Sequence, residues 1–139
     1  KFKEVFSMKK ERLVIIMNEN HTLLPEQERI LKERFPFLDP EFLFAPNSGW
    51  SKEEMDQIAA SFKEAAIGPN RYLAQYIIFV SPIPYLLREL TRSEVIPYPE
   101  CSIQTGIWVH VFHNDRREKK ELPDGRIIQV VAQEGWQLV

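Results

Sequence analysis

Short apolar runs rich in β-branched residues alternate with helix-like segments along this chain, and this alternation limits the possible fold more than any other feature. Four runs read as strands, at residues 12–17, 41–46, 76–80 and 107–112. Continuous apolar runs of this length are typical of strands buried in a parallel sheet. Strands that alternate with helices favour a mainly parallel sheet covered by helices on both faces. The sequence therefore predicts an α/β fold, a Rossmann-like three-layer sandwich.

Three helices are expected between these strands. The first begins near Pro25, because proline suits the first helical turn, and "FPFLDP" ends it. The second follows the "SKEE" capping box that opens at Ser51, and its apolar residues recur at helical spacing over 52–66. The third follows Ser81 and places Leu86, Leu87 and Leu90 on one face.

The C-terminal part carries a hairpin signal. The segments "REKKEL" and "RIIQVV" flank "PDG", which predicts a β-hairpin that either extends the sheet or forms a dimer-facing arm. "GWQLV" is expected to give a last short strand, and "PYPECSIQTG" a loop. We expect residues 12–139 to form a single domain, preceded by an N-terminal extension or leader at residues 1–11.

Composition narrows the function classes. The 139 residues are 44% hydrophobic, enough for a core without metal or disulfide support, and the net charge of -2 argues against binding to long nucleic acid. One cysteine and three histidines make a disulfide framework and a metal site unexpected, and the single cysteine fits the reducing cytoplasm. Glycine-rich phosphate motifs are absent, so no cofactor is expected. No apolar run reaches the roughly 18 residues that span a membrane.

Polar residues follow each predicted strand. In open α/β sheets, ligands bind beyond the carboxyl ends of the parallel strands, so these loops are expected to converge on one ligand-binding edge. The candidates that we draw from them are Asn18, Asn20, His21, Trp50, Ser81, His113, Asn114 and Arg116.

Each main candidate has a structural and a functional interpretation. Ser81 either caps the following helix or holds a phosphate through its hydroxyl, on a turn that Pro82 and Pro84 stiffen. His21 is either a solvated loop histidine or a ligand contact that exchanges a proton near neutral pH. Trp50 either packs at the start of its helix or stacks on a base. The charged run that contains Arg116 is typical of a solvated hairpin.

Three segments together resemble small stand-alone CRISPR-associated Rossmann-fold (CARF-like) proteins of the ring-nuclease type. These segments are "IIMNENHTLLPEQERIL", "IIFVSPIPYLLREL" and "VHVFHNDRREKKELPDGRIIQVV". The resemblance implies a homodimer that binds cyclic oligoadenylate, the messenger of type III CRISPR defence. It also implies cleavage without metal, by attack of a ribose 2′-OH on the adjacent phosphate.

The resemblance assigns roles to the candidate residues. Asn18, Asn20, His21 and Ser81 would line the ligand, while His113 and Arg116 would stabilise charge or donate a proton. Two alternatives remain: a non-catalytic sensor or sponge of the same fold, and a regulatory α/β domain that contacts a protein partner through its hairpin.

Overall fold

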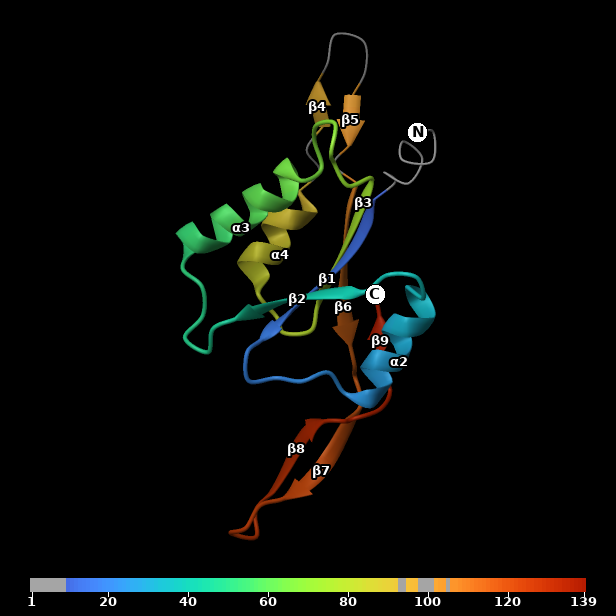
Figure 1. Ribbon diagram of the computed structural model, residues 1–139. Helices are drawn as coiled ribbons and strands as arrows, with labels where there is room; N and C mark the ends of the chain where they lie inside the picture. Colours follow the sequence, from blue (N-terminus) through green and yellow to red (C-terminus); the bar gives the residue numbers. More distant parts are fainter. Residues whose placement is uncertain (1–9, 93–94, 98–101, 105) are drawn as a thin grey trace.

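The computed structural model of the chain describes residues 10–92, 95–97, 102–104 and 106–139 (Figure 1). Most of the predicted N-terminal extension, residues 1–9, and Cys101 in the predicted loop lie outside this part. The first strand, β1, runs from Glu11 to Asn18, so it begins at the last residue of the stretch that was expected to precede the domain.

A five-stranded mixed sheet forms the centre of the fold. Its strand order is β2-β1-β3-β6-β9, with β2, β1, β3 and β6 parallel and β9 antiparallel to β6. The remaining strand bounds are Pro40–Ala45 for β2, Ala74–Phe79 for β3, Ile107–His113 for β6 and Gln137–Leu138 for β9. The predicted α/β class, the mainly parallel sheet and the last short strand are confirmed.

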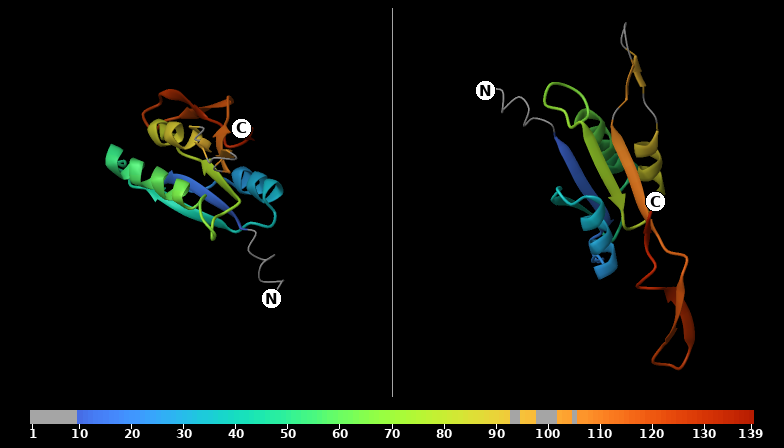
Figure 2. Two further views of the ribbon diagram at one scale, coloured as in Figure 1. Left: turned by 90° about the horizontal axis from the view of Figure 1, so that it is seen from above. Right: turned by 90° about the vertical axis from the view of Figure 1, so that its right-hand side faces the viewer.

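Helices cover both faces of the sheet (Figure 2). Helix α2 (Pro25–Arg34) packs on the face that carries Leu13, Ile15 and Met17 of β1. Helices α3 (Lys52–Glu64) and α4 (Pro84–Thr91) pack on the face that carries the alternate β1 residues. In the part of the chain that the structure describes, no helix is long and apolar enough to cross a membrane.

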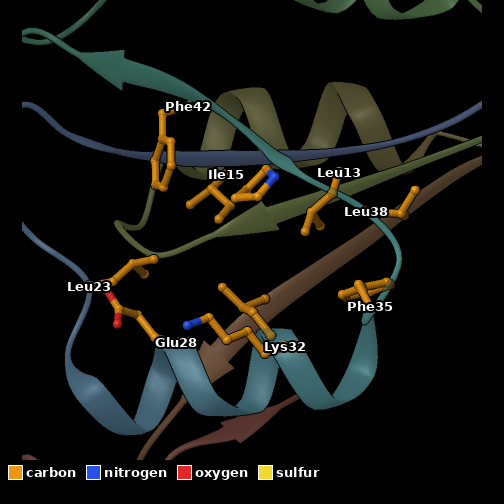
Figure 3. Close-up of a pocket in the computed structure, with 10 residues that line it drawn as sticks. Leu13, Ile15, Leu23, Glu28, Lys32, Phe35, Leu38 and Phe42 are labelled. Atoms are coloured by element: carbon orange, nitrogen blue, oxygen red, sulfur yellow. The ribbon is translucent and has the colours of Figure 1, made fainter.

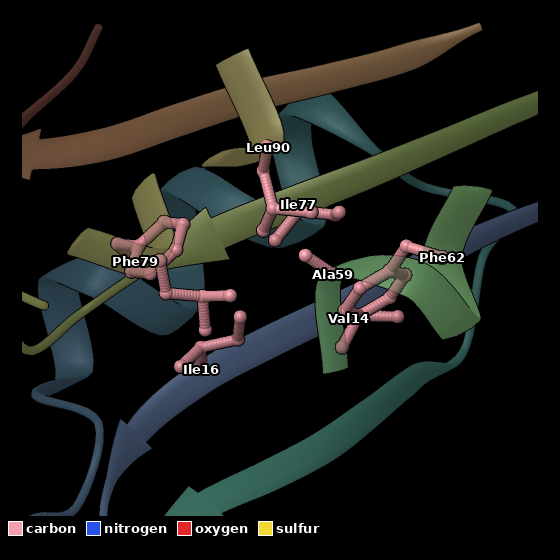
Figure 4. Packing of buried hydrophobic residues seen from close by; sticks show 8 residues of the cluster. Val14, Ile16, Ala59, Phe62, Ile77, Phe79 and Leu90 are labelled. Carbon is pink, nitrogen blue, oxygen red and sulfur yellow. The ribbon is translucent and has the colours of Figure 1, made fainter. Parts of the chain in front are cut away.

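The larger hydrophobic core lies between the sheet and helices α3 and α4. Figure 4 shows its side chains interleaving, with Val14 and Ile16 from β1, Ile77 and Phe79 from β3, and Phe62 from α3. All five are at most 2% exposed. Burying an apolar side chain of this size contributes about 1.5–3 kcal/mol, so this cluster holds both helices firmly against the strands.

The helix starts follow local chemistry. Ser51 and Glu54 form the predicted capping box, because the Ser51 hydroxyl accepts from the Glu54 N–H and the Glu54 carboxylate accepts from the Ser51 N–H. Of the two interpretations of Ser81, the one in which it caps the third helix is wrong: α4 begins at Pro84, with Ile83 at its N-cap. Residues that precede proline disfavour helical geometry, and Pro82 and Pro84 therefore delay the helix.

Two small antiparallel pairs lie outside the main sheet. The predicted hairpin is confirmed as β7 (Arg117–Glu121) paired with β8 (Ile127–Val131), and it projects beyond the carboxyl end of β6 (Figures 1 and 2). Within the segment predicted as a loop, β5 (Ser102–Gln104) pairs with β4 (Val95–Pro97). The loop prediction was therefore wrong for Pro97 and for residues 102–104, because backbone pairing between β4 and β5 overrides the turn-forming composition.

Candidate functional site

The neighbouring strands β1 and β3 send their connections to opposite faces of the sheet. The chain leaves β1 toward α2 on one face, and it leaves β3 toward α4 on the other. Such a divergence is the topological switch point at which open α/β sheets bind ligands, in a crevice beyond the carboxyl ends of the strands. The two loops that start at Asn18 and Ser81 border this point.

Ser81 joins these two loops through its hydroxyl. The backbone N–H of Asn18 donates to Ser81 Oγ at 2.9 Å, and His21 Nδ1 lies 2.8 Å from the same oxygen. Ser81 is only 6% exposed, whereas His21 is an exposed residue. The His21 N–H also donates to the Asn18 carbonyl at 2.9 Å, which closes a tight turn after β1.

This contact fixes one side of the imidazole. Ser81 Oγ accepts from the Asn18 N–H and keeps one hydrogen and a second lone pair, so it can donate to His21 Nδ1 or accept from it, according to the tautomer of the ring. When the neutral ring carries its proton on Nδ1 and donates to Ser81, the other ring nitrogen, Nε2, can act as a base. It has no hydrogen-bond partner in the described part of the chain and can face a ligand.

A pocket of about 300 Å³ opens beside Ser81. Asn18, Trp50 and Ser81 line it together with residues of the loop after β2 and of the segment that leads into α4. Trp50 also packs against the hydrophobic core that α3 covers, which confirms the packing interpretation of this residue. The remaining predicted ligand residue of this region, Asn20, is exposed, and its N–H donates to the side chain of Asn18 at 2.9 Å.

His113 lies in a second pocket, of about 510 Å³, which is apolar over most of its lining. The two pockets share Pro82, Ile83 and Pro84, so this short segment, the proline ledge, separates them. The structure therefore brings Asn18, His21 and Ser81 together and places His113 on the other side of the ledge.

Asn114 braces the base of the hairpin. Its buried amide donates to the carbonyls of Ala132 and Glu134, both at 3.0 Å, and its oxygen accepts from the Arg116 N–H at 2.9 Å. These bonds use both ends of the Asn114 side chain. The Arg116 side chain lies across Gly135, where an added Cβ would be 2.6 Å from its Cδ.

A third pocket, of about 180 Å³, lies between α2 and strands β1 and β2. Figure 3 shows apolar side chains from the strands facing α2, among them Ile15 and Phe42, while Glu28 and Lys32 extend from the helix. The polar groups do not converge as they do around Ser81. We therefore place the candidate site at the carboxyl edge of the sheet.

Tyr85 lines the pocket beside Ser81, and Asp56 holds Tyr85 through a hydrogen bond. The sequence analysis did not identify either residue. Tyr85 donates to Asp56 Oδ1 at 2.6 Å, and Lys52 Nζ contacts Asp56 Oδ2 at 2.8 Å. The pKa of Asp56 lies below its usual value because Lys52, and then Tyr85, donate hydrogen bonds to its carboxylate. The pKa of Tyr85 is raised, chiefly by its hydrogen bond to Asp56. No local motif marks this contact, because it joins two helices.

The side chains at this edge do not suit a metal ion. In the described residues, no three histidine, cysteine, aspartate or glutamate side chains gather in a way that could hold a metal ion. The edge instead offers hydroxyl, amide, imidazole and indole groups. Comparison of the chain with protein-family models, curated proteins and solved structures gives no match.

Proposed function

We propose that this protein binds cyclic oligoadenylate at the carboxyl edge of its sheet and cleaves it without metal. The single observation that carries the proposal is the contact of His21 Nδ1 with Ser81 Oγ at the switch point between β1 and β3. The backbone N–H of Asn18 donates to the same oxygen and holds it in place. The resemblance of three sequence segments to CARF-like proteins of the ring-nuclease type supplies the substrate class. In this proposal the fold is Rossmann-like and the protein is a cytoplasmic homodimer.

The reaction that we propose needs positioning and proton transfer rather than a protein nucleophile. The ribose 2′-OH attacks the adjacent phosphorus, the bond to the 5′-oxygen breaks, and a 2′,3′-cyclic phosphate and a 5′-OH result. With Nδ1–H donating to Ser81 Oγ, the neutral ring of His21 removes the 2′-OH proton through Nε2, and solvent water supplies the proton that the leaving 5′-oxygen takes up. General acid–base catalysis of this kind contributes about 10²–10⁴-fold to a rate.

The other candidates contribute binding and charge stabilisation. Asn18 and Asn20 contact the sugar-phosphate backbone, and Trp50 stacks on a base. His113 and Arg116 stabilise charge from the far side of the proline ledge, where Asn114 holds the loop that carries them. A two-fold ligand suits a two-fold dimer, since each protomer then serves half of the ring. With a net charge of -2, binding depends on these contacts rather than on a broad basic field.

The test is incubation with cyclic tetra-adenylate and cyclic hexa-adenylate in EDTA, with the products followed by chromatography. We expect linear products that end in a 2′,3′-cyclic phosphate. His21→Gln is expected to slow cleavage by about 10²-fold or more. His110→Gln serves as the matched control, because His110 lies within β6 against Phe35 and, unlike His21, makes no contact with Ser81 in the described part of the chain.

The alternatives give different results. Tight binding of a ring without turnover would identify a sensor or sponge. An unchanged rate in both His21→Gln and His113→Gln would remove these histidines from the mechanism. No thermal shift with either ring would overturn the proposal and favour the regulatory α/β domain.

A further inference from the structure

We infer that the pocket beside Ser81 is an adenine subsite and that Asn47 reads the base. This inference rests on the proposed function and extends it, because it names the residue that selects adenine. The pocket of about 300 Å³ is at the lower end of the range of about 300–1,000 Å³ that is usual for small-molecule sites. It therefore suits one nucleoside unit rather than a whole ring.

The walls of this pocket suit a flat aromatic group. Trp50, Met55 and Tyr85 line it together with prolines from the two flanking loops. The hydroxyl of Tyr85 is fixed by its 2.6 Å hydrogen bond to Asp56, and that carboxylate also binds Lys52. The tyrosine wall is therefore held in place before any ligand arrives, which lowers the entropic cost of binding.

Asn47 is positioned by its backbone while its side chain stays available. Its N–H donates to Glu19 Oε1 at 2.9 Å, and the Glu19 N–H donates to the Ala45 carbonyl at 2.8 Å. The Gly49 N–H closes the turn onto the Pro46 carbonyl at 2.8 Å, with Gly49 at a φ of 83°. Among the described residues, no hydrogen bond engages the exposed Asn47 amide.

Asn18, the other asparagine that lines this pocket, is less available to bind a base. Asn18 Oδ1 accepts from the Asn20 N–H, so one end of its amide is occupied. Asn47 can bind through both the oxygen and the nitrogen of its side-chain amide. A carboxamide pairs with adenine in a bidentate way: its oxygen accepts from N6 and its nitrogen donates to N7. Because Asn18 and Ser81 line the same pocket, a base held here places its ribose and phosphate toward His21.

The experiment compares three rings and four proteins by calorimetry. The rings are cyclic oligoadenylate, the same ring with inosine, which lacks the N6 donor, and the ring with 7-deaza-adenosine, which lacks the N7 acceptor. The proteins are the unaltered chain, Asn47→Ala, Asn47→Asp and the control Asn70→Ala. Asn70 is an exposed asparagine in the loop before β3, at the opposite edge of the sheet.

We expect Asn47→Ala to weaken binding of the adenylate ring by about 5- to 150-fold, which is the range for one bidentate base contact. The affinity for the inosine ring should stay almost unchanged. Asn47→Asp keeps the acceptor for N6 and loses the donor to N7, so it should bind the adenine and 7-deaza rings about equally. Asn70→Ala should behave as the unaltered chain does.

Two outcomes separate this inference from the proposed function. If the ring binds and is cleaved while Asn47→Ala keeps the full preference for adenine, the subsite is wrong and the proposed function stands. If no ring binds, adenosine monophosphate is titrated while the NMR signal of the Trp50 indole is followed. A shift that Asn47→Ala abolishes would support the subsite without the proposed function, and an unmoved indole would overturn the subsite as well.

Discussion

Ser81 contacts two residues that lie 60 and 63 positions before it in the chain. Its hydroxyl accepts from the Asn18 N–H and contacts His21 Nδ1, and it is almost fully buried. A buried donor that loses its partner costs about 1–3 kcal/mol. The same hydroxyl therefore stabilises the loop after β1 and sets the orientation of the candidate proton carrier.

Ser81→Ala is expected to lower the free energy of unfolding by about 1–2 kcal/mol, because the Asn18 N–H loses its acceptor. It should also change the tautomer balance of neutral His21, because Nδ1 loses its hydrogen-bond partner. Urea denaturation measures the first effect, and ¹⁵N NMR of the imidazole measures the second. Ser61→Ala is a control at an exposed serine of α3. An unchanged tautomer in Ser81→Ala would show that Ser81 does not orient the ring.

At the scale of elements, Glu26 ties the first turn of α2 to the C-terminal segment. One carboxylate oxygen accepts from the N–H groups of Gly135 and Trp136, at 2.8 and 2.7 Å. The two partners are more than 100 residues away in sequence. This contact holds the start of β9 beside α2, and β9 in turn pairs with the end of β6, where His113 lies.

Glu26→Ala is expected to cost about 1.5–3 kcal/mol of stability, since two hydrogen bonds to a charged group are lost. Amide hydrogen exchange should accelerate at Gly135 and Trp136 while the amides of α3 keep their protection. Glu28→Ala, an exposed glutamate in the same helix, is the control. Equal exchange in the two variants at these amides would contradict the role of Glu26.

At the scale of the whole molecule, His110 couples protonation to folding. It lies in β6, edge-on to Phe35 with ring centroids 6.2 Å apart. Its pKa lies below the usual 6.5, first because burial disfavours the charged ring and second because Arg34 repels it. A backbone hydrogen bond to Val139 opposes this shift only in part.

The sign of the coupling follows from that direction. Above 6.5 the ring is neutral in the folded and unfolded chain, so His110 adds no pH dependence there. As the pH falls below 6.5, the unfolded chain takes up the proton more readily, and stability declines until the folded pKa is passed. His110→Gln should therefore lose less stability than the unaltered chain between about pH 7.5 and pH 5 in urea titrations. Parallel profiles for the two proteins would contradict this coupling.

Much of the fold could be predicted from local patterns. Apolar runs located the four parallel strands, and the capping box at Ser51 located α3, because these signals depend on neighbours within one or two turns. The late start of α4 also follows from a local rule: Ser81 and Ile83 each precede a proline. The short β4–β5 pair did not follow, since its partners are joined through a segment rich in turn residues.

The candidate site could be predicted only as a set of loops at one edge. Local patterns were enough to show that Asn18, His21 and Ser81 follow the ends of buried strands. Only the packed structure shows that Ser81 contacts His21, that Asn114 braces the hairpin and that the proline ledge lies between His113 and the pocket lined by Asn18 and Ser81. The reason is physical: strand patterns are set by residues close in sequence, whereas hydrogen-bond partners are set by strand order and register, which bring together residues far apart in the chain.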